Sequence, residues 1–143
     1  MEFEPDALEI LQGRHVAVFA TLVKGGPAMA CVWYGFDGGD LIVSTPAGRR
    51  KDRNVQADNR VALLVDVREG THVPGATPYK GVEVRGLAEM QDDDSGQLWR
   101  AIVGRYLDPV PPEFEERLLN QERRIIRIRP ERVRVWDHAR GRR

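Results

Sequence analysis

The sequence predicts a mainly β protein, a small six-stranded barrel flanked by a few short helices. Six segments rich in apolar and β-branched residues are separated by turns that contain glycine, proline or aspartate. Several of these segments are apolar on both faces, which favours a barrel whose outer wall is covered. A second copy of the chain is the simplest cover, so we expect a homodimer.

Length and composition indicate one soluble domain. The chain has 143 residues, of which 41% are hydrophobic and 31% charged, as is typical of a globular protein. Its formal net charge is +0, which argues against nucleic acid as the default partner. No apolar run reaches the roughly 20 residues of a membrane helix, and the N-terminus lacks a signal-peptide pattern. We therefore expect a single cytoplasmic domain over residues 1–143, with no membrane contact.

The N-terminal elements follow from turn residues and apolar runs. Residues 5–13 predict a short helix, since proline lies in its first turn and glycine just beyond its end. Residues 15–23 and 28–36 are apolar strands joined by a Lys-Gly-Gly-Pro turn, which predicts a hairpin. A second glycine-rich turn leads into a third strand over residues 41–44.

The middle of the chain alternates between polar and apolar segments. After Pro46, residues 47–58 predict a basic helix and residues 61–67 a fourth strand. Residues 68–78 predict a loop, because they contain two glycines, two prolines and two threonines. Residues 82–89 alternate in polarity, which is the period of a strand with one wetter face.

The C-terminal third predicts two helices and a last strand. Three aspartates and a serine at residues 92–95 supply caps for an amphipathic helix whose apolar stripe covers residues 98–106. A shorter helix begins after the proline pair that ends at Pro112. The last strand is expected over 124–129 and then 133–136, followed by a disordered tail over 136–143.

The segment over residues 44–55 carries a charge pattern that points to an anion. Ser44 or Thr45 is placed to cap the predicted helix, with proline at its first position. Three cations at residues 49–51 then lie in the first turn, where the helix dipole disfavours positive charge by about 0.3–1 kcal/mol each. A phosphate would resolve this conflict, because free N–H groups, hydroxyls and cations all face it. The alternative is a solvated basic helix face with the two nearby aspartates as partners, and the pattern alone leaves both open.

Several short motifs occur in a fixed order around this segment. Residues 44–63 read Ser-Thr, a short spacer, Arg-Arg-Lys, Asn-Val and Asp-Asn-Arg-Val-Ala-Leu. Ala-Thr-Leu at 20–22, Val-Trp-Tyr-Gly-Phe-Asp at 32–37 and Val-Glu-Val-Arg-Gly at 82–86 extend the pattern. The chain thus resembles the pyridoxamine 5′-phosphate oxidase-like flavin-binding split β-barrels over most of its length. Its closing segment, residues 126–137, is similar to the members thought to use the deazaflavin coenzyme F-420.

This resemblance implies a cofactor bound at the interface of a homodimer. Arg50 and Lys51 would bind its phosphate, and the strand over residues 29–34 would run beside its ring. The cofactor-binding residues that the resemblance implies by position are Met29, Val32, Trp33, Tyr34, Ser44, Thr45, Arg49, Arg50, Lys51 and Asn54.

The chain also departs from the true pyridoxamine phosphate oxidases. Met29 and Tyr34 occupy positions where those enzymes place an arginine and a lysine, and Gly81 lies near the position of their glutamine. His138 and Arg140 do not reproduce their C-terminal substrate-binding segment. Oxidation of vitamin B6 is therefore not expected, and no catalytic residue is implied.

The resemblance favours an oxidoreductase that transfers hydride from reduced coenzyme F-420 to a small unsaturated acceptor. In such chemistry the cofactor performs the transfer, so no catalytic acid or base is assigned. Arg53, Lys80 and Arg85 are available to bind the polyglutamate tail of F-420. One alternative keeps the fold and binds FMN. Another is a non-catalytic protein that carries a flavin, a deazaflavin or haem.

The other reactive or aromatic residues are interpreted mainly as structural. Cys31 lies among small and apolar residues and is expected to be buried, and the histidines share no metal-ligand spacing, so no metal site is expected. His72 lies in the loop over 68–78, which could fold over a bound ring. Trp33 and Tyr34 either flank the ring or fill the core. Packing is the interpretation for Trp99 and Tyr106, and interface packing for Trp136.

Overall fold

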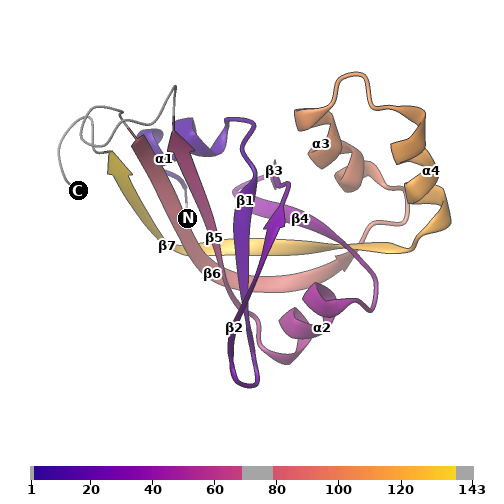
Figure 1. Ribbon diagram of the computed structural model, residues 1–143, viewed down its shortest axis with the longest axis horizontal. Coiled ribbons are helices and arrows are strands. Elements are labelled where there is room, and N and C mark those ends of the chain that lie inside the picture. The colour runs from indigo at the N-terminus through magenta and orange to yellow at the C-terminus, as the bar shows by residue number, and fades with distance from the viewer. Residues whose placement is uncertain (1, 69–78, 138–143) are drawn as a thin grey trace.

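Seven strands form one antiparallel sheet in the part of the chain that this computed structural model describes, residues 2–68 and 79–137 (Figure 1). The strand order is β2-β1-β5-β6-β7-β4-β3, so β2 and β3 are the two edges of the sheet. The mainly β class predicted from the sequence is confirmed. The strands are β1 (Ala17–Val23), β2 (Gly26–Val32), β3 (Gly35–Asp37), β4 (Asp40–Pro46), β5 (Arg60–Arg68), β6 (Tyr79–Asp92) and β7 (Arg123–Asp137).

The strand that the sequence analysis missed results from a break after Val32. The predicted strand 28–36 is two strands, because β2 pairs with β1 whereas β3 pairs with β4. Trp33 and Tyr34 carry the chain between these two ladders, from one edge of the sheet to the other. An unbroken apolar run does not reveal such a change of partner.

The two predicted C-terminal segments, by contrast, are one long strand. β7 pairs with β6 along nearly its whole length, with one irregularity between Arg85 and Gly86. A side chain at Gly86 would place its Cβ 2.1 Å from the carbonyl oxygen of Arg129, so only glycine permits this close approach. Pro130, which looks like a strand breaker in the sequence, lies opposite Gly86 at this irregularity.

The hydrophobic core fills the inner face of the curved sheet. The helix α1 (Pro5–Leu11) closes one end of it with Ala7, Ile10 and Leu11. Burial of each large aliphatic or aromatic side chain contributes about 1.5–3 kcal/mol, so this face supplies most of the stabilisation. Its strand residues include Phe19, Leu41, Val43, Leu63, Val82, Val84, Ile126 and Ile128.

Three further helices pack around the sheet: α2 (Arg50–Ala57), α3 (Gln97–Tyr106) and α4 (Pro112–Asn120). The predicted capping of α3 is confirmed, because the Asp93 carboxylate accepts hydrogen bonds from the N–H groups of Leu98 (3.1 Å) and Trp99 (2.9 Å). α3 and α4 lie side by side at one end of the sheet (Figure 1), yet α4 contributes no buried residue. Within residues 2–68 and 79–137, no helix has the length and hydropathy to cross a membrane.

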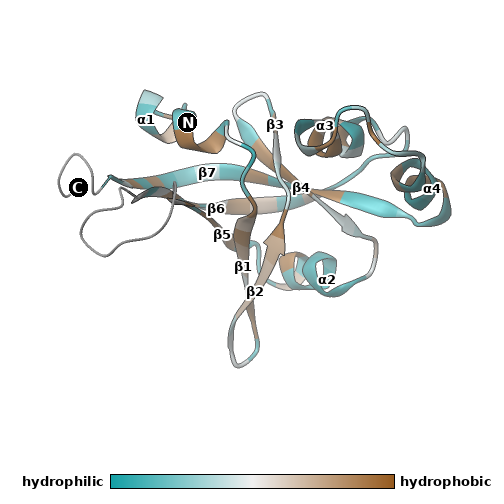
Figure 2. Ribbon diagram, turned by 45° about the horizontal axis from the view of Figure 1, so that its top comes forward, coloured by the Kyte–Doolittle hydropathy of each residue, from teal (hydrophilic) through white to brown (hydrophobic). Residues whose placement is uncertain are grey.

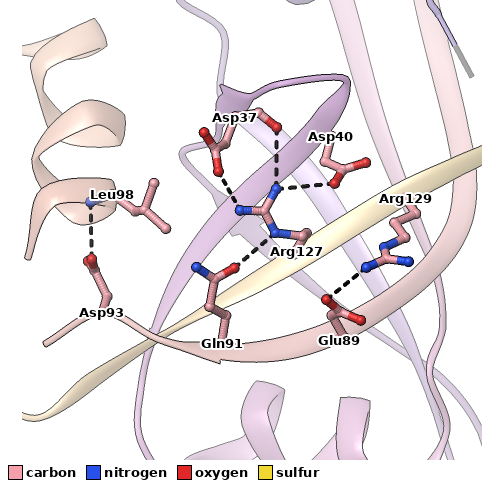
Figure 3. A network of polar contacts seen from close by, with 8 residues as sticks. All are labelled: Asp37, Asp40, Glu89, Gln91, Asp93, Leu98, Arg127 and Arg129. Carbon is pink, nitrogen blue, oxygen red and sulfur yellow. Dashed lines mark hydrogen bonds and ion pairs between the residues drawn. The ribbon is translucent and has the colours of Figure 1, made fainter.

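A polar network fixes the short β3–β4 turn to the long strands (Figure 3). The guanidinium of Arg127 on β7 donates to both carboxylates of the turn, from Asp37 and Asp40, and its Nε donates to Oε1 of Gln91 on β6 at 2.9 Å. The Arg127 side chain is only 14% exposed, so these partners replace the water that it loses. The turn is therefore held in place beside the region where α3 packs.

The β1–β2 hairpin projects from the rest of the sheet, and its two strands consist mainly of apolar residues (Figure 2). On its outer side three residues of β1 lie opposite three of β2. Met29 among them is 72% exposed. We call this surface the hairpin outer face; it consists of Val18, Ala20, Leu22, Pro27, Met29 and Cys31.

Candidate functional site

A cleft of about 270 Å³ lies between the sheet and the α3–α4 pair. The ends of β2 and β4 and the starts of α2 and β7 form one side, and α3 and α4 form the other. Its polar side chains are Ser44, Lys51, Arg117 and Arg123. Its apolar side is made mainly by Trp33, Trp99, Ile102, Val103 and Phe114.

The pairing of β4 with β7 brings a serine and an arginine together at the cleft. Ser44 lies opposite Ile125, and Pro46 lies opposite Arg123. The Nε of Arg123 donates a hydrogen bond to Oγ of Ser44 at 2.9 Å, and another of its nitrogens donates to Oε1 of Gln121 at 3.0 Å. Both partners are neutral, so they orient the guanidinium without cancelling its charge.

The predicted capping of α2 by Ser44 or Thr45 is wrong, because both residues belong to β4. A turn with Gly48 at φ +73° separates the strand from the helix, and the helix begins at Arg50. The Thr45 side chain is fully buried, and its hydroxyl has no hydrogen-bond partner among the described residues. Ser44 therefore reaches the cleft, whereas the Thr45 side chain faces the interior.

Asp52, in the first turn of α2, accepts the hydrogen bonds that hold the start of this helix in place. Its carboxylate accepts the N–H of Gly48 at 2.7 Å, the amide of Gln56 at 2.6 Å and the guanidinium of Arg124 at 3.1 Å. Burial would raise the pKa of Asp52, but these three donors together lower it. These three donors occupy the Asp52 carboxylate, and none of them lines the cleft.

The cleft cations repel one another. Burial lowers the pKa of Lys51, and the nearby charges of Arg123 and Arg50 lower it further. Burial likewise lowers the pKa of Arg123, with a second contribution from Arg117. Among the described residues, no carboxylate lines the cleft to relieve this repulsion. The site is therefore suited to a negatively charged ligand.

The alternative of a solvated basic face with aspartate partners finds little support. Asp52 bonds to Arg124, and Asp58 forms an ion pair with Arg60 at 2.7 Å. Within the described ranges, neither aspartate pairs with a cation at positions 49–51. The charge conflict predicted from the sequence thus persists in the fold.

Of the cations at positions 49–53, Lys51 lines the cleft, and the predicted Asn54 amide has another role. The Arg49, Arg50 and Arg53 side chains are exposed on the helix surface. Arg50 still acts on the cleft electrostatically, since it lowers the pKa of Lys51. The Asn54 amide instead donates to Oγ1 of Thr21 on β1 at 3.1 Å, a contact that ties α2 to the sheet.

The expectation that Cys31 is buried is wrong. β2 is an edge strand whose side chains alternate between the two faces, and Cys31 lies on the exposed face together with Met29. Cys31 also lines the cleft, as do Val32, which is buried, and Trp33. An apolar run at an edge strand does not imply burial on both faces.

Trp33 and Tyr34 have different environments although they are neighbours. The Trp33 ring stacks on Tyr106, with ring centroids 4.6 Å apart and planes 9° apart, and lies nearly parallel to Phe114 at 6.2 Å. The Tyr34 side chain is fully buried, and its hydroxyl donates to the carbonyl of Leu11 at 2.7 Å. Burial, assisted by Tyr106, raises the pKa of Tyr34 to about 12. Trp33 is a cleft residue, whereas the Tyr34 ring belongs to the core.

The backbone of Tyr34 is also engaged by the protein. Its N–H donates to the hydroxyl of Tyr106 at 3.3 Å, and its carbonyl accepts the guanidinium of Arg105. Arg105 also donates to the carbonyls of Leu11 (3.0 Å) and Gly13 (3.1 Å). These contacts fix α3 to the N-terminal region and thereby position Tyr106, on which the cleft residue Trp33 stacks.

Two cleft cations, Arg117 and Arg123, are absent from the residues predicted by the sequence analysis. The signal for Arg123 was a basic residue at the start of the last strand, but its relevance depends on the β4–β7 register. Trp99 is buried, as its packing role predicted, and in addition lines the cleft. His72 and most of the 68–78 loop lie outside the described residues, as do residues 138–143 of the predicted tail, whereas its first two residues, Trp136 and Asp137, end β7 instead.

Comparison with known proteins matches residues 3–137 to the family model described as pyridoxamine 5′-phosphate oxidase. A conserved hypothetical protein from Mycobacterium tuberculosis is similar in fold, with 24% identity, a TM-score of 0.76 and coverage of 96% of this chain and 86% of that chain. An F420 reductase has 26% identity, a TM-score of 0.68 and coverage of 92% and 98%. A heme binding protein from Mycobacterium smegmatis has 25% identity and a TM-score of 0.66, with 93% of this chain covering 55% of that chain.

Proposed function

Because this chain belongs to the pyridoxamine 5′-phosphate oxidase family of split barrels, we propose that its cleft binds the phosphate of a flavin-type cofactor. This proposal rests on one observation: cations converge on the cleft, and no carboxylate is among its described lining residues. Of the two cofactors considered, we propose the deazaflavin F-420. The 26% identity to an F420 reductase over nearly the whole of both chains supports this choice.

The residues present fit a phosphate. Lys51 and Arg123 offer charge-assisted hydrogen bonds, and the Ser44 hydroxyl holds the Arg123 guanidinium in position. Burial, and after it charge repulsion, lowers both pKa values, and an anion among these cations would relieve the repulsion. In the proposed complex, Lys51 and Arg123 bind the phosphate directly, and Arg50 adds charge from the exposed side of α2.

The protein's part in the reaction is positioning and exclusion of water. When bound, the reduced deazaflavin would supply a hydride to a small unsaturated acceptor. Trp33, Trp99 and Phe114 give the cleft an apolar surface that excludes water from the reacting groups. Histidine, aspartate and glutamate are all missing from the cleft lining in the described ranges, so we assign no acid or base there.

We also propose that the active form is a homodimer with the cofactor near the interface. The hairpin outer face offers six adjoining residues without a charged side chain, and Met29 at its centre is 72% exposed. Exposed apolar patches of this kind are typical of protein interfaces. Cys31 belongs both to this face and to the cleft lining, so a second copy docked here would lie beside the cofactor site.

The test is anaerobic oxidation of reduced F-420, followed by its absorbance, against a panel of enones, quinones and tetrapyrroles. Acceptor-dependent oxidation supports the proposal. Tight retention of FMN without any response to F-420 would favour an FMN enzyme of the same fold. Binding without turnover, or binding of haem as in the similar Mycobacterium smegmatis protein, would favour a carrier.

A further inference from the structure

The cleft contains more positive charge than one phosphodiester neutralises. Lys51, Arg117 and Arg123 all line it, and Arg50 is close enough to lower the pKa of Lys51. No carboxylate lines it within the described residues, and a phosphodiester carries only one negative charge. The excess leaves room for a second anionic group, which could be a carboxylate of the cofactor's own tail or one of the acceptor.

Arg117 lies on a different element from the other cations of the cleft. Lys51 and Arg123 come from α2 and β7, on or beside the sheet, whereas Arg117 comes from α4 on the opposite side. Arg123 is bonded to Ser44, and both it and Arg117 line the cleft, so the two guanidiniums share this space. Arg117 therefore marks a second end of the cleft.

The Arg117 side chain is also directed away from its expected helix partner. Glu113 lies four residues earlier, the spacing at which Glu and Arg form an intrahelical pair. Instead, the guanidinium carbon of Arg117 lies 5.0 Å from the centroid of the Phe114 ring. In the part of the chain that the structure describes, Arg117 forms no ion pair, and the neighbouring Glu115 is engaged by Arg100 at 3.0 Å. The charge of Arg117 is thus left available to a ligand.

An aromatic wall lies directly beneath this charge. Phe114 is nearly parallel to Trp33, with an angle of 13° between the ring planes. Trp33 in turn stacks on Tyr106, which holds the set rigid. Because these rings stack on one another and Arg117 lies over Phe114, a flat ligand would contact the parts of Phe114 and Trp33 that line the cleft, while its anionic group meets the guanidinium.

We propose that Arg117 is a specificity-determining residue that binds the carboxylate of a flat aromatic acceptor packed against Phe114 and Trp33. The proposal deepens the function proposed above, since it names the class of acceptor, and it rests on that function for the cleft being the active site. A neutral acceptor of the same shape would leave the charge of Arg117 unmatched and would bind more weakly.

The test uses 2-naphthoate and its neutral counterpart 2-naphthamide as probes of the cofactor-free protein. Binding is followed by the tryptophan fluorescence of Trp33 and Trp99, which line the cleft, and by calorimetry. We expect the wild type to prefer naphthoate, and Arg117→Ala to weaken naphthoate binding about tenfold or more, because a charge-assisted bond is lost. Arg132→Ala, which removes an exposed arginine on β7 outside the cleft, is the matched control and should bind both probes like the wild type.

Equal affinity for the two probes, or unchanged naphthoate binding in Arg117→Ala, would overturn the proposal. So would a variant that loses affinity for F-420 but keeps the preference for naphthoate, since Arg117 would then serve the cofactor. If the wild type binds neither F-420 nor FMN yet shows an Arg117-dependent preference for naphthoate, the carboxylate site stands and the cofactor assignment fails. The melting temperature of each variant checks that its fold is intact.

Discussion

The Nε of Arg123 donates a hydrogen bond to Oγ of Ser44 at 2.9 Å, and this bond joins the start of β7 to β4 at the wall of the cleft. The two residues are far apart in the sequence and meet only because β4 and β7 are adjacent in the sheet. The bond leaves part of the guanidinium facing the cleft with its charge uncancelled. Ser44 thereby positions a cation instead of neutralising it.

Arg123→Ala is expected to weaken the binding of inorganic phosphate about tenfold or more, because one charge-assisted contact is lost. Ser44→Ala removes only the orienting hydroxyl and should cause a smaller loss. Calorimetric titration with phosphate measures both variants. An effect of Ser44→Ala as large as that of Arg123→Ala would show that Ser44 contacts the anion itself.

Anion binding should depend on the protonation of Lys51. Its pKa is lowered by burial, then by Arg123 and Arg50, so it loses its proton at a lower pH than an ordinary lysine. An anion stabilises the protonated form, so affinity falls as the pH rises through this lowered pKa. For stability the sign is opposite: the unfolded lysine keeps its proton longer, so stability of the free protein rises with pH in the window up to about 10.4.

The matched variant for this prediction is Lys51→Arg, whose guanidinium stays protonated throughout that window. We expect wild-type affinity for phosphate to fall as the pH rises through the lowered pKa of Lys51, and the affinity of Lys51→Arg to stay level over the same window. Titrations across a pH series measure this difference. Parallel curves for the two proteins would mean that Lys51 does not contact the anion.

Asp52 should be the acid-sensitive point of the site. Its side chain is 3% exposed and bound by Gly48, Gln56 and Arg124, so Asp52→Ala is expected to cost about 3 kcal/mol, as for a broken buried ion pair. Because its pKa is lowered in the folded state, its contribution is present at neutral pH and is lost as the pH falls through that lowered pKa. Urea denaturation at neutral and acidic pH measures both effects. Asp94→Ala, which removes an exposed aspartate before α3, is the control and should change stability little.

The sequence predicted most of the fold because hydrophobic periodicity and turn residues are local signals. The break at Trp33 and Tyr34 escaped it, since a run that stays apolar does not show where the pairing partner changes. Lys51 was predicted from a conflict with the helix dipole, which is again local. Arg123 and Arg117 were missed because only the β4–β7 register and the placing of α4 bring them to Lys51.

Met29→Asp should disrupt the proposed homodimer, because it places a charge at the centre of the hairpin outer face. We expect a smaller particle in size-exclusion chromatography with light scattering, with the melting temperature little changed. Leu119→Asp is the matched control, since Leu119 is 81% exposed on α4, away from this face. Dimerisation that persists in Met29→Asp would place the interface elsewhere.

The central claim is that the cleft at Lys51 holds the phosphate of a flavin-type cofactor, and a binding titration tests it most directly. Wild type, Lys51→Ala and the Arg132→Ala control are each titrated with F-420 and with FMN. We predict binding of F-420 by wild type and control, and a loss of about tenfold or more in Lys51→Ala with its fold intact. Equal affinity of Lys51→Ala and wild type, or binding of neither cofactor by the wild type, would contradict the account.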